Sequence, residues 1–236
     1  MVTLDKIYQA AFGLKQVARR TDMIFAPKLS TDCELYLKTE NLQLTGSFKL
    51  RGAYYKISQL SEEQRAAGII ACSAGNHAQG VALAASRMGI RSIICMPDGA
   101  PISKVESTKA LGAEVCLVKG AYDDSYAHAC RLQQETGSTF IHPFNDDEVS
   151  AGQGTIGLEI LDQLADVDAV ICPIGGGGLI SGVAYAIKTL NPNVKVYGVQ
   201  AENAPAWPRA WRGARPSPWR PCRPLPTASR SSTPAT

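Results

Sequence analysis

Ile69-Ile70-Ala71-Cys72-Ser73-Ala74-Gly75-Asn76-His77-Ala78-Gln79-Gly80 is the stretch that decides the fold. A short apolar run typical of a buried strand leads into a polar loop. A helix is then predicted over residues 78–88, with Gly89 as its stop signal. The same order of strand, loop and helix recurs along the chain, and strands that alternate with helices of this length predict a parallel sheet wrapped by helices.

The next 60 or so residues continue this alternation. Further strands are predicted over 91–96, 114–118 and 139–141, with helices over 103–111 and 122–135 between them. A second unit follows, with a helix over 155–164, strands over 169–173 and 195–200, and a helix over 179–190. This unit is a βαβ crossover, which we expect to be right-handed.

The N-terminal part adds a predicted helix over 4–19 and a strand over 34–38. We predict an α/β protein of two parallel or mixed-sheet domains. Residues 1–48 and 153–203 form the larger domain, and residues 49–152 form the smaller one.

The composition changes sharply after about residue 204. The last 32 residues hold eight of the 14 prolines, all three tryptophans and six of the 24 basic residues, with no Asp or Glu. They show no periodicity that would build a core, so we predict a disordered tail. Two origins fit this composition, a natural tail or a frameshifted C-terminus, and the abrupt change favours the frameshift.

The rest of the chain has the charge balance of an ordinary soluble protein. Residues 1–204 carry 18 basic and 21 acidic side chains, which is no footprint for nucleic acid. The N-terminus has no apolar leader, and 169–187 is charge-free but broken by Pro173 and four glycines, so we expect neither secretion nor a membrane span. Of the seven cysteines, Cys72, Cys95, Cys116 and Cys172 lie in apolar runs, which predicts buried thiols in a reducing cytoplasm.

Three segments carry the chemistry, and the first surrounds a lysine. Lys49 lies in Thr45-Gly46-Ser47-Phe48-Lys49-Leu50-Arg51-Gly52-Ala53, where small residues let the backbone approach a planar ligand. A buried lysine has a lowered pKa and can react with an aldehyde. A solvated surface charge is the ordinary alternative for any single lysine.

The second segment is the loop Ser73-Ala74-Gly75-Asn76-His77, which follows a strand and opens a helix. Free N–H groups at a helix N-terminus suit a substrate carboxylate, and Asn76 can donate to a ring oxygen. Simple N-capping is the alternative. His77 has no metal-site spacing to the other histidines, so no metal site is predicted.

The third segment is the run of glycines between a predicted strand and helix. Gly175, Gly176, Gly177 and Gly178 allow several N–H groups to converge on a phosphate. A dinucleotide fingerprint fails at Ile180 and Ser181, and no Gly-Lys-Ser/Thr of a P-loop follows. A lysine, a polar loop and a phosphate loop are together the parts needed to hold an aldehyde cofactor that bears a phosphate.

These segments resemble the fold-type II pyridoxal-phosphate enzymes, with the tryptophan synthase β-like fold. The run 38–53, the run 73–80 and Gly152-Gln153-Gly154-Thr155-Ile156 are similar to the threonine/serine dehydratase family, including its serine racemase branch. The resemblance covers about residues 5–203 and implies a cytoplasmic, homo-oligomeric enzyme whose larger domain is incomplete here.

The resemblance also implies roles for single residues. Lys49 would bind the cofactor pyridoxal 5'-phosphate covalently and act as the catalytic base, with Ser73 facing it as a second acid or base. The remaining cofactor contacts would come from Phe48, Asn76, Gly175, Gly176, Gly177, Gly178 and Leu179. The substrate carboxylate would be bound by Ser73, Ala74, Gly75, Asn76 and His77.

The implied reaction is β-elimination from a small hydroxy amino acid. Threonine would give 2-oxobutanoate and ammonia, and serine would give pyruvate. Metal-binding racemase relatives carry a Glu where this chain has Gln200, which weakens the racemase alternative. A non-catalytic remnant of the family is the second alternative, because the family continues for roughly another hundred residues that complete the larger domain.

Overall fold

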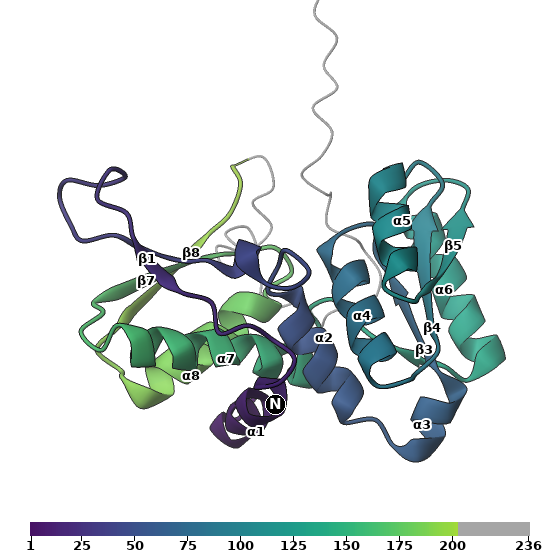
Figure 1. Cartoon of the computed structure of the whole chain (residues 1–236), viewed down its shortest axis with the longest axis horizontal. Coiled ribbons are helices and arrows are strands. Elements are labelled where there is room, and N and C mark those ends of the chain that lie inside the picture. The colour runs from purple at the N-terminus through teal and green to yellow at the C-terminus, as the bar shows by residue number, and fades with distance from the viewer. Residues whose placement is uncertain (203–236) are drawn as a thin grey trace, which may run out of the picture.

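A four-stranded parallel sheet forms the centre of one half of the molecule (Figure 1). The computed structural model describes residues 1–202. The strand order is β5-β4-β3-β6, and all neighbouring pairs are parallel. The bounds of these strands are β3 (Ile69–Cys72), β4 (Ser92–Pro97), β5 (Glu114–Val118) and β6 (Thr139–Phe140). The predicted parallel sheet is therefore confirmed, with strand ends within one residue of those expected.

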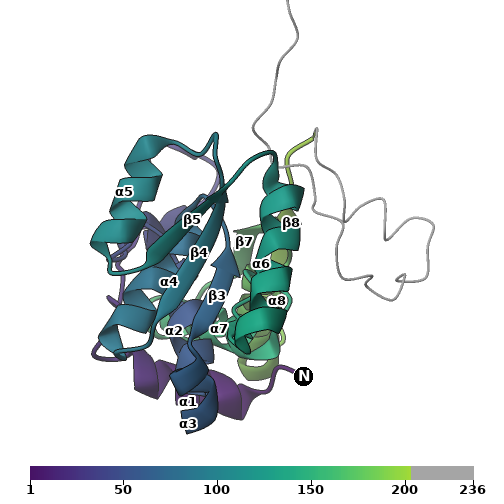
Figure 2. The ribbon, with the colours of Figure 1, turned by 90° about the vertical axis from the view of Figure 1, so that its right-hand side faces the viewer.

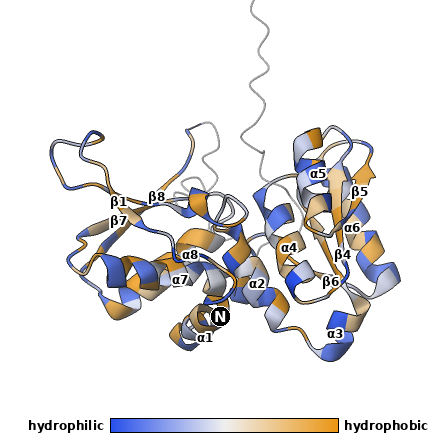
Figure 3. Ribbon diagram, viewed as in Figure 1, coloured by the Kyte–Doolittle hydropathy of each residue, from blue (hydrophilic) through white to orange (hydrophobic). Residues whose placement is uncertain are grey.

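Helices cover both faces of this sheet (Figure 2). One face, with Ala71 and Ile94, packs against α4 (Asn76–Arg87) and α5 (Ile102–Ala110). The other face packs against α6 (Tyr122–Thr136), which closes on Gly137 in the left-handed conformation. Because side chains alternate between the faces of a strand, the continuous apolar runs of β3 and β4 are buried on both sides. The labelled strand β4 appears mostly hydrophobic (Figure 3).

The other half contains a second parallel pair and a set of packed helices. β7 (Ala169–Pro173) and β8 (Lys195–Val199) are joined by α8 (Gly178–Leu190), as the predicted crossover requires. α8 packs on α7 (Asp147–Gln163), and both contact α1 (Leu4–Leu14). A short antiparallel pair, β1 (Met23–Phe25) with β2 (Tyr36–Lys38), lies at the edge of this half.

Helix α2 (Lys49–Ser58) lies between the two halves (Figure 1). It packs on α4 on one side and on α7 on the other. The contact with α7 is very close, because a Cβ at Gly152 would come within 2.6 Å of the Cα of Gly52. The prediction contains no element between 49 and 67, where α2 and α3 (Glu62–Ala67) lie, nor one at η1 (Glu40–Leu42). The division into domains 1–48 with 153–203 and 49–152 stays a prediction.

Two predicted helix bounds are wrong. α7 begins at Asp147 and not at residue 155, because Asp146 caps it by accepting from the backbone N–H groups of Glu148 and Val149. Gly152 and Gly154, which precede the predicted start, lie inside the helix and allow close helix packing. α1 ends at Leu14 and not at residue 19, because the chain turns there and the backbone of Arg19 binds the side chain of Gln43.

The cysteines lie where the sequence predicted. Cys72, Cys95 and Cys172 are buried on strands, Cys116 is partly buried, and each is a free thiol. Within residues 1–202, no helix combines the length and the hydropathy that a membrane crossing needs. The predicted tail after residue 204 falls outside the residues described.

Candidate active site

Lys49 is the first residue of α2. Its backbone N–H donates to Ser47 Oγ at 3.1 Å. Its Nζ donates to the carbonyl oxygen of Pro143 at 2.7 Å and lies 5.3 Å from the centre of the Phe48 ring. Burial lowers the pKa of Lys49 to about 8. About a tenth of this amine is therefore neutral at pH 7, and attack on an aldehyde requires the neutral form.

α4, which covers the four-stranded sheet, contacts the backbone of Lys49. A Cβ at Gly80 would lie 3.0 Å from the carbonyl carbon of Lys49 and from the nitrogen of Leu50. This approach is possible only because position 80 is glycine. It brings the first turn of α4, which contains Asn76 and His77, next to the start of α2.

The loop before α4 is built as the sequence suggests. Ser73 Oγ accepts from the N–H of Gly75 at 3.2 Å within the loop, and no side chain caps α4 at Gly75. Asn76 is exposed at the first position of α4, while Ala74 packs against the core. The open first turn of α4 can accept a carboxylate, although the N–H of Gly75 already has an internal partner.

His77 is buried directly behind this loop. Its Nε2 is 2.9 Å from the carbonyl oxygen of Ile141 and therefore carries the proton, while its Nδ1 has no hydrogen-bond partner. Burial, and then the charge of Lys49, lower the pKa of His77 to about 3. His77 is thus a neutral side chain that ties the loop to the strand end at Ile141. The residues described contain no group of three or more His, Cys, Asp or Glu side chains placed to hold a metal ion.

The glycine loop lies between β7 and α8. Gly177 has φ +96°, a left-handed conformation that favours glycine, and it caps the helix that begins at Gly178. The first N–H groups of a helix have no acceptor within the helix, so those of α8 are available to an anion. Leu179 packs in the same apolar cluster as Phe48 and Val170, which places the phosphate loop near the lysine segment.

A segment that the sequence analysis missed joins these parts. The carbonyl oxygens of Ile141 and Pro143 accept from His77 and Lys49, and Phe144 lies on the glycine loop. A Cβ at Gly176 would come within 2.2 Å of the Phe144 ring. His142 Nδ1 holds the turn by accepting from the backbone N–H groups of Phe144 and Asn145. Burial lowers the pKa of His142 to about 4. These contacts use mostly backbone oxygens, and no sequence motif marks them.

The structure therefore brings all three predicted segments together. An aldehyde with a phosphate fits this arrangement, because the buried amine of Lys49 donates to the carbonyl oxygen of Pro143, and the next residue, Phe144, lies against the glycine loop that opens α8. Phe48 lies beside the amine, and Gly80 of α4 lies against the backbone at the start of α2.

Comparisons with known proteins show the family of the chain. The model of the family "Pyridoxal-phosphate dependent enzyme" matches residues 14–236. L-threonine ammonia-lyase of Thermotoga maritima is 56% identical over 217 residues, which are 91% of this chain and 54% of that protein. The catabolic L-threonine dehydratase TdcB of Staphylococcus aureus is 51% identical over 86% of this chain and 60% of its own length. The chain thus spans little more than half the length of these curated relatives.

Solved structures give the same fold. Maize serine racemase superposes with a TM-score of 0.86 at 36% identity, over 89% of this chain and 64% of that one. Threonine deaminase isoform 2 from Solanum lycopersicum gives a TM-score of 0.80 at 42% identity, over 86% of this chain and 58% of that one. The predicted α/β fold of the fold-type II pyridoxal-phosphate enzymes is confirmed, and the chain covers only part of each of these structures.

Proposed function

Because the chain belongs to the family of pyridoxal-phosphate dependent enzymes, we propose that its site carries out β-elimination from threonine and serine, as an ammonia-lyase does. One observation carries the proposal: the buried amine of Lys49, with a pKa lowered to about 8, lies beside the Pro143–Phe144 turn that rests on the glycine loop. The identity of 56% to an L-threonine ammonia-lyase supports the choice of substrate.

Each side chain then has a task that its position supports. Lys49 binds the aldehyde of pyridoxal 5'-phosphate and, once released by the substrate, takes the proton from the substrate Cα. Its lowered pKa suits this base role near neutral pH. When bound, the cofactor supplies an electron sink for the carbanion that proton removal leaves.

The cofactor contacts come from both halves of the molecule. The phosphate is bound by the backbone of Gly175–Gly178 and by the N–H of Leu179 at the start of α8. Phe48 packs beside the ring, and Asn76 donates to its 3' oxygen. His77 stays neutral and orients the loop through Ile141.

The substrate is a small hydroxy amino acid. Its carboxylate is bound by the loop 73–77 at the N-terminus of α4, where free N–H groups favour an anion. The products are 2-oxobutanoate and ammonia from threonine, or pyruvate and ammonia from serine. We place the reaction in the cytoplasm, in a homo-oligomer, in keeping with the free buried thiols.

Racemisation of serine is the second candidate. The superposition on maize serine racemase favours it, and Ser73 would then be the acid or base opposite Lys49. Gln200, where metal-binding racemases carry a Glu, and the higher identity to threonine ammonia-lyases both favour elimination.

The test is turnover by the purified chain supplied with pyridoxal phosphate. We expect 2-oxo acid from L-threonine or L-serine, loss of at least about a thousandfold in K49A, and no loss in K109A, which removes an exposed lysine of α5. D-serine formed without 2-oxo acid would favour the racemase. No product from either amino acid would contradict the proposal and leave a non-catalytic relative.

A further inference from the structure

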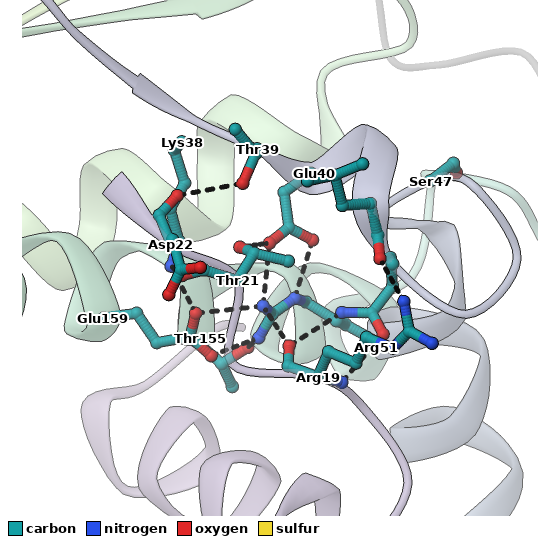
Figure 4. Close-up of polar contacts among 12 residues, drawn as sticks. Arg19, Thr21, Asp22, Lys38, Thr39, Glu40, Ser47, Arg51, Thr155 and Glu159 are labelled. Carbon is teal, nitrogen blue, oxygen red and sulfur yellow. Dashed lines mark hydrogen bonds and ion pairs between the residues drawn. The ribbon is translucent and has the colours of Figure 1, made fainter. Parts of the chain in front are cut away.

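Arg51 is the most deeply buried charged side chain of the described residues, with 1% of its surface exposed. It lies two residues after Lys49, in the first turn of α2. Its guanidinium contacts η1, α7 and the turn after α1 at the same time (Figure 4). A cation this buried needs a complete set of acceptors, and the structure supplies one.

The acceptors come from two carboxylates, a hydroxyl and a carbonyl. Glu40 accepts from Nε at 2.9 Å and from Nη2 at 2.8 Å, a bidentate pair. Glu159 of α7 accepts from Nη1 at 2.6 Å and from Nη2 at 3.0 Å. Thr155 Oγ1 and the Arg19 carbonyl oxygen, at 3.2 and 3.1 Å, complete the set. Burial alone would lower the pKa of Arg51, but its hydrogen bonds to Glu40 and Glu159 outweigh burial and raise it.

A second cation balances the charge. Lys38 of β2 donates to Glu159 Oε2 at 2.6 Å, and also to Thr21 and Gln163. The cluster thus holds two cations and two anions, with every partner at most 17% exposed. Lys38 contacts the same carboxylate as Arg51 but lies on a strand and not on the helix that carries Lys49.

The cluster connects the helix that carries Lys49 to the phosphate loop through α7. Lys49 and Arg51 share the first turn of α2, and Arg51 fixes that turn to α7 through Glu159. α7 in turn packs closely on α8, and the glycine loop opens α8. The packing is close because a Cβ at Gly182 would lie 2.0 Å from the Ser150 carbonyl oxygen.

Pyridoxal phosphate carries its aldehyde and its phosphate on one rigid ring. The protein groups that bind the aldehyde and the phosphate must therefore lie at a fixed separation. We propose that Arg51 is a positioning residue, which sets the distance between Lys49 and the glycine loop by tying α2 to η1 and α7. This inference rests on the cofactor site proposed above. It predicts that Arg51 matters to a ligand with both groups and not to one that has only the aldehyde.

The test compares pyridoxal phosphate with pyridoxal, which lacks the phosphate. Each is added to the full chain, fixed with borohydride, and the label on Lys49 is measured by peptide mapping over a concentration series. We expect the wild-type chain to label Lys49 at far lower concentrations of pyridoxal phosphate than of pyridoxal. In R51M this preference falls by at least about tenfold, while labelling by pyridoxal is retained.

K38M is the matched control. It also removes a buried cation from Glu159, and with it some stability, but it leaves the tie of α2 intact. We expect K38M to keep the preference for the phosphate within about twofold. R51K replaces R51M as the test variant if R51M fails to fold. The lysine ammonium retains the charge but cannot bind both carboxylates in a fork, so R51K should also lose the preference for the phosphate.

Two results would overturn the inference. R51K and any folded R51M that keep the wild-type preference, or a K38M variant that loses it equally, would show that Arg51 only stabilises the fold. A wild-type chain with no preference for the phosphate at Lys49 would instead contradict the proposed cofactor site, and the inference with it. The wild-type measurement therefore separates the two failures.

Discussion

The two parallel sheets of this molecule are built from similar sequence but are covered very differently. In β3 every residue is buried, because α4 and α6 cover both faces of the four-stranded sheet. In β7 and β8, Val170, Cys172 and Val196 are at least partly buried, whereas Ile171, Tyr197 and Val199 are 65%, 51% and 54% exposed. Both sheets have the apolar strands of a two-sided core, but the second has helices on one face.

The chain also spans only part of the length of its relatives. It covers 54% of the Thermotoga maritima protein and 60% of the Staphylococcus aureus protein, and its match to them includes both sheets. The exposed face of β7 and β8 has the apolar composition of a strand buried on both sides. The site lies between the two regions, so its lysine is held beside a sheet that helices cover on both faces and its phosphate loop beside a sheet that the described helices cover on one.

The largest expected effect separates the two sheets directly. Ile94→Ala in β4 removes a side chain that is 0% exposed, and should cost about 2–5 kcal/mol of unfolding free energy. Ile171→Ala in β7 removes the same atoms from an exposed position, and should change stability by at most about 0.5 kcal/mol. Urea unfolding of both variants measures the difference. Equal costs would mean that the outer face of β7 is covered in solution.

Helix packing, not sheet packing, should dominate the stability of the second region. Gly182→Ala places a methyl group 2.0 Å from the Ser150 carbonyl oxygen, so α7 and α8 must separate, at about 1–3 kcal/mol or more. Gly13→Ala is the control, since no atom lies within 4 Å of the added methyl in α1, and it should stabilise by about 0.5–1 kcal/mol. Thermal unfolding compares the two, and a neutral Gly182→Ala would refute the close α7–α8 contact.

A pH dependence is expected from the boundary between the regions. Burial lowers the pKa of His77 to about 3 and that of His142 to about 4, from an ordinary 6.5. Between those values the unfolded chain binds more protons, so stability should fall as pH decreases from 6.5. Each histidine adds at most about 1.4 kcal/mol per pH unit.

Substitution identifies the source of that slope. H77Q should reduce it, and H128Q, which changes a histidine bonded to Arg131 on α6, should not. Urea unfolding at pH 4.5 to 7 measures both variants. A slope unchanged in H77Q would mean that His77 is protonated or solvated in the native state.

The elements that sequence predicts well are those with local stop signals. β3, β5 and α6 begin or end at glycines and apolar runs that need no tertiary contact to recognise. The start of α7 was harder to place, because it depends on the Asp146 cap, and Gly152 and Gly154 pack against α2 and α8 only in the folded chain. Lys49 and the glycine loop were found as motifs. Pro143, Phe144 and the function of Arg51 depend on backbone oxygens and buried charges that only the folded chain brings together.

The central claim is that Lys49 is the lysine that binds the cofactor. The most direct measurement is the pH profile of borohydride-fixed pyridoxal phosphate at each lysine of the wild-type chain, by peptide mapping from pH 6 to 10. We expect Lys49 to take most of the label. We also expect its labelling rate to rise with pH and to be half-maximal near pH 8, because its buried amine loses a proton there. Label spread over exposed lysines such as Lys109, with no such rise at Lys49, would contradict it.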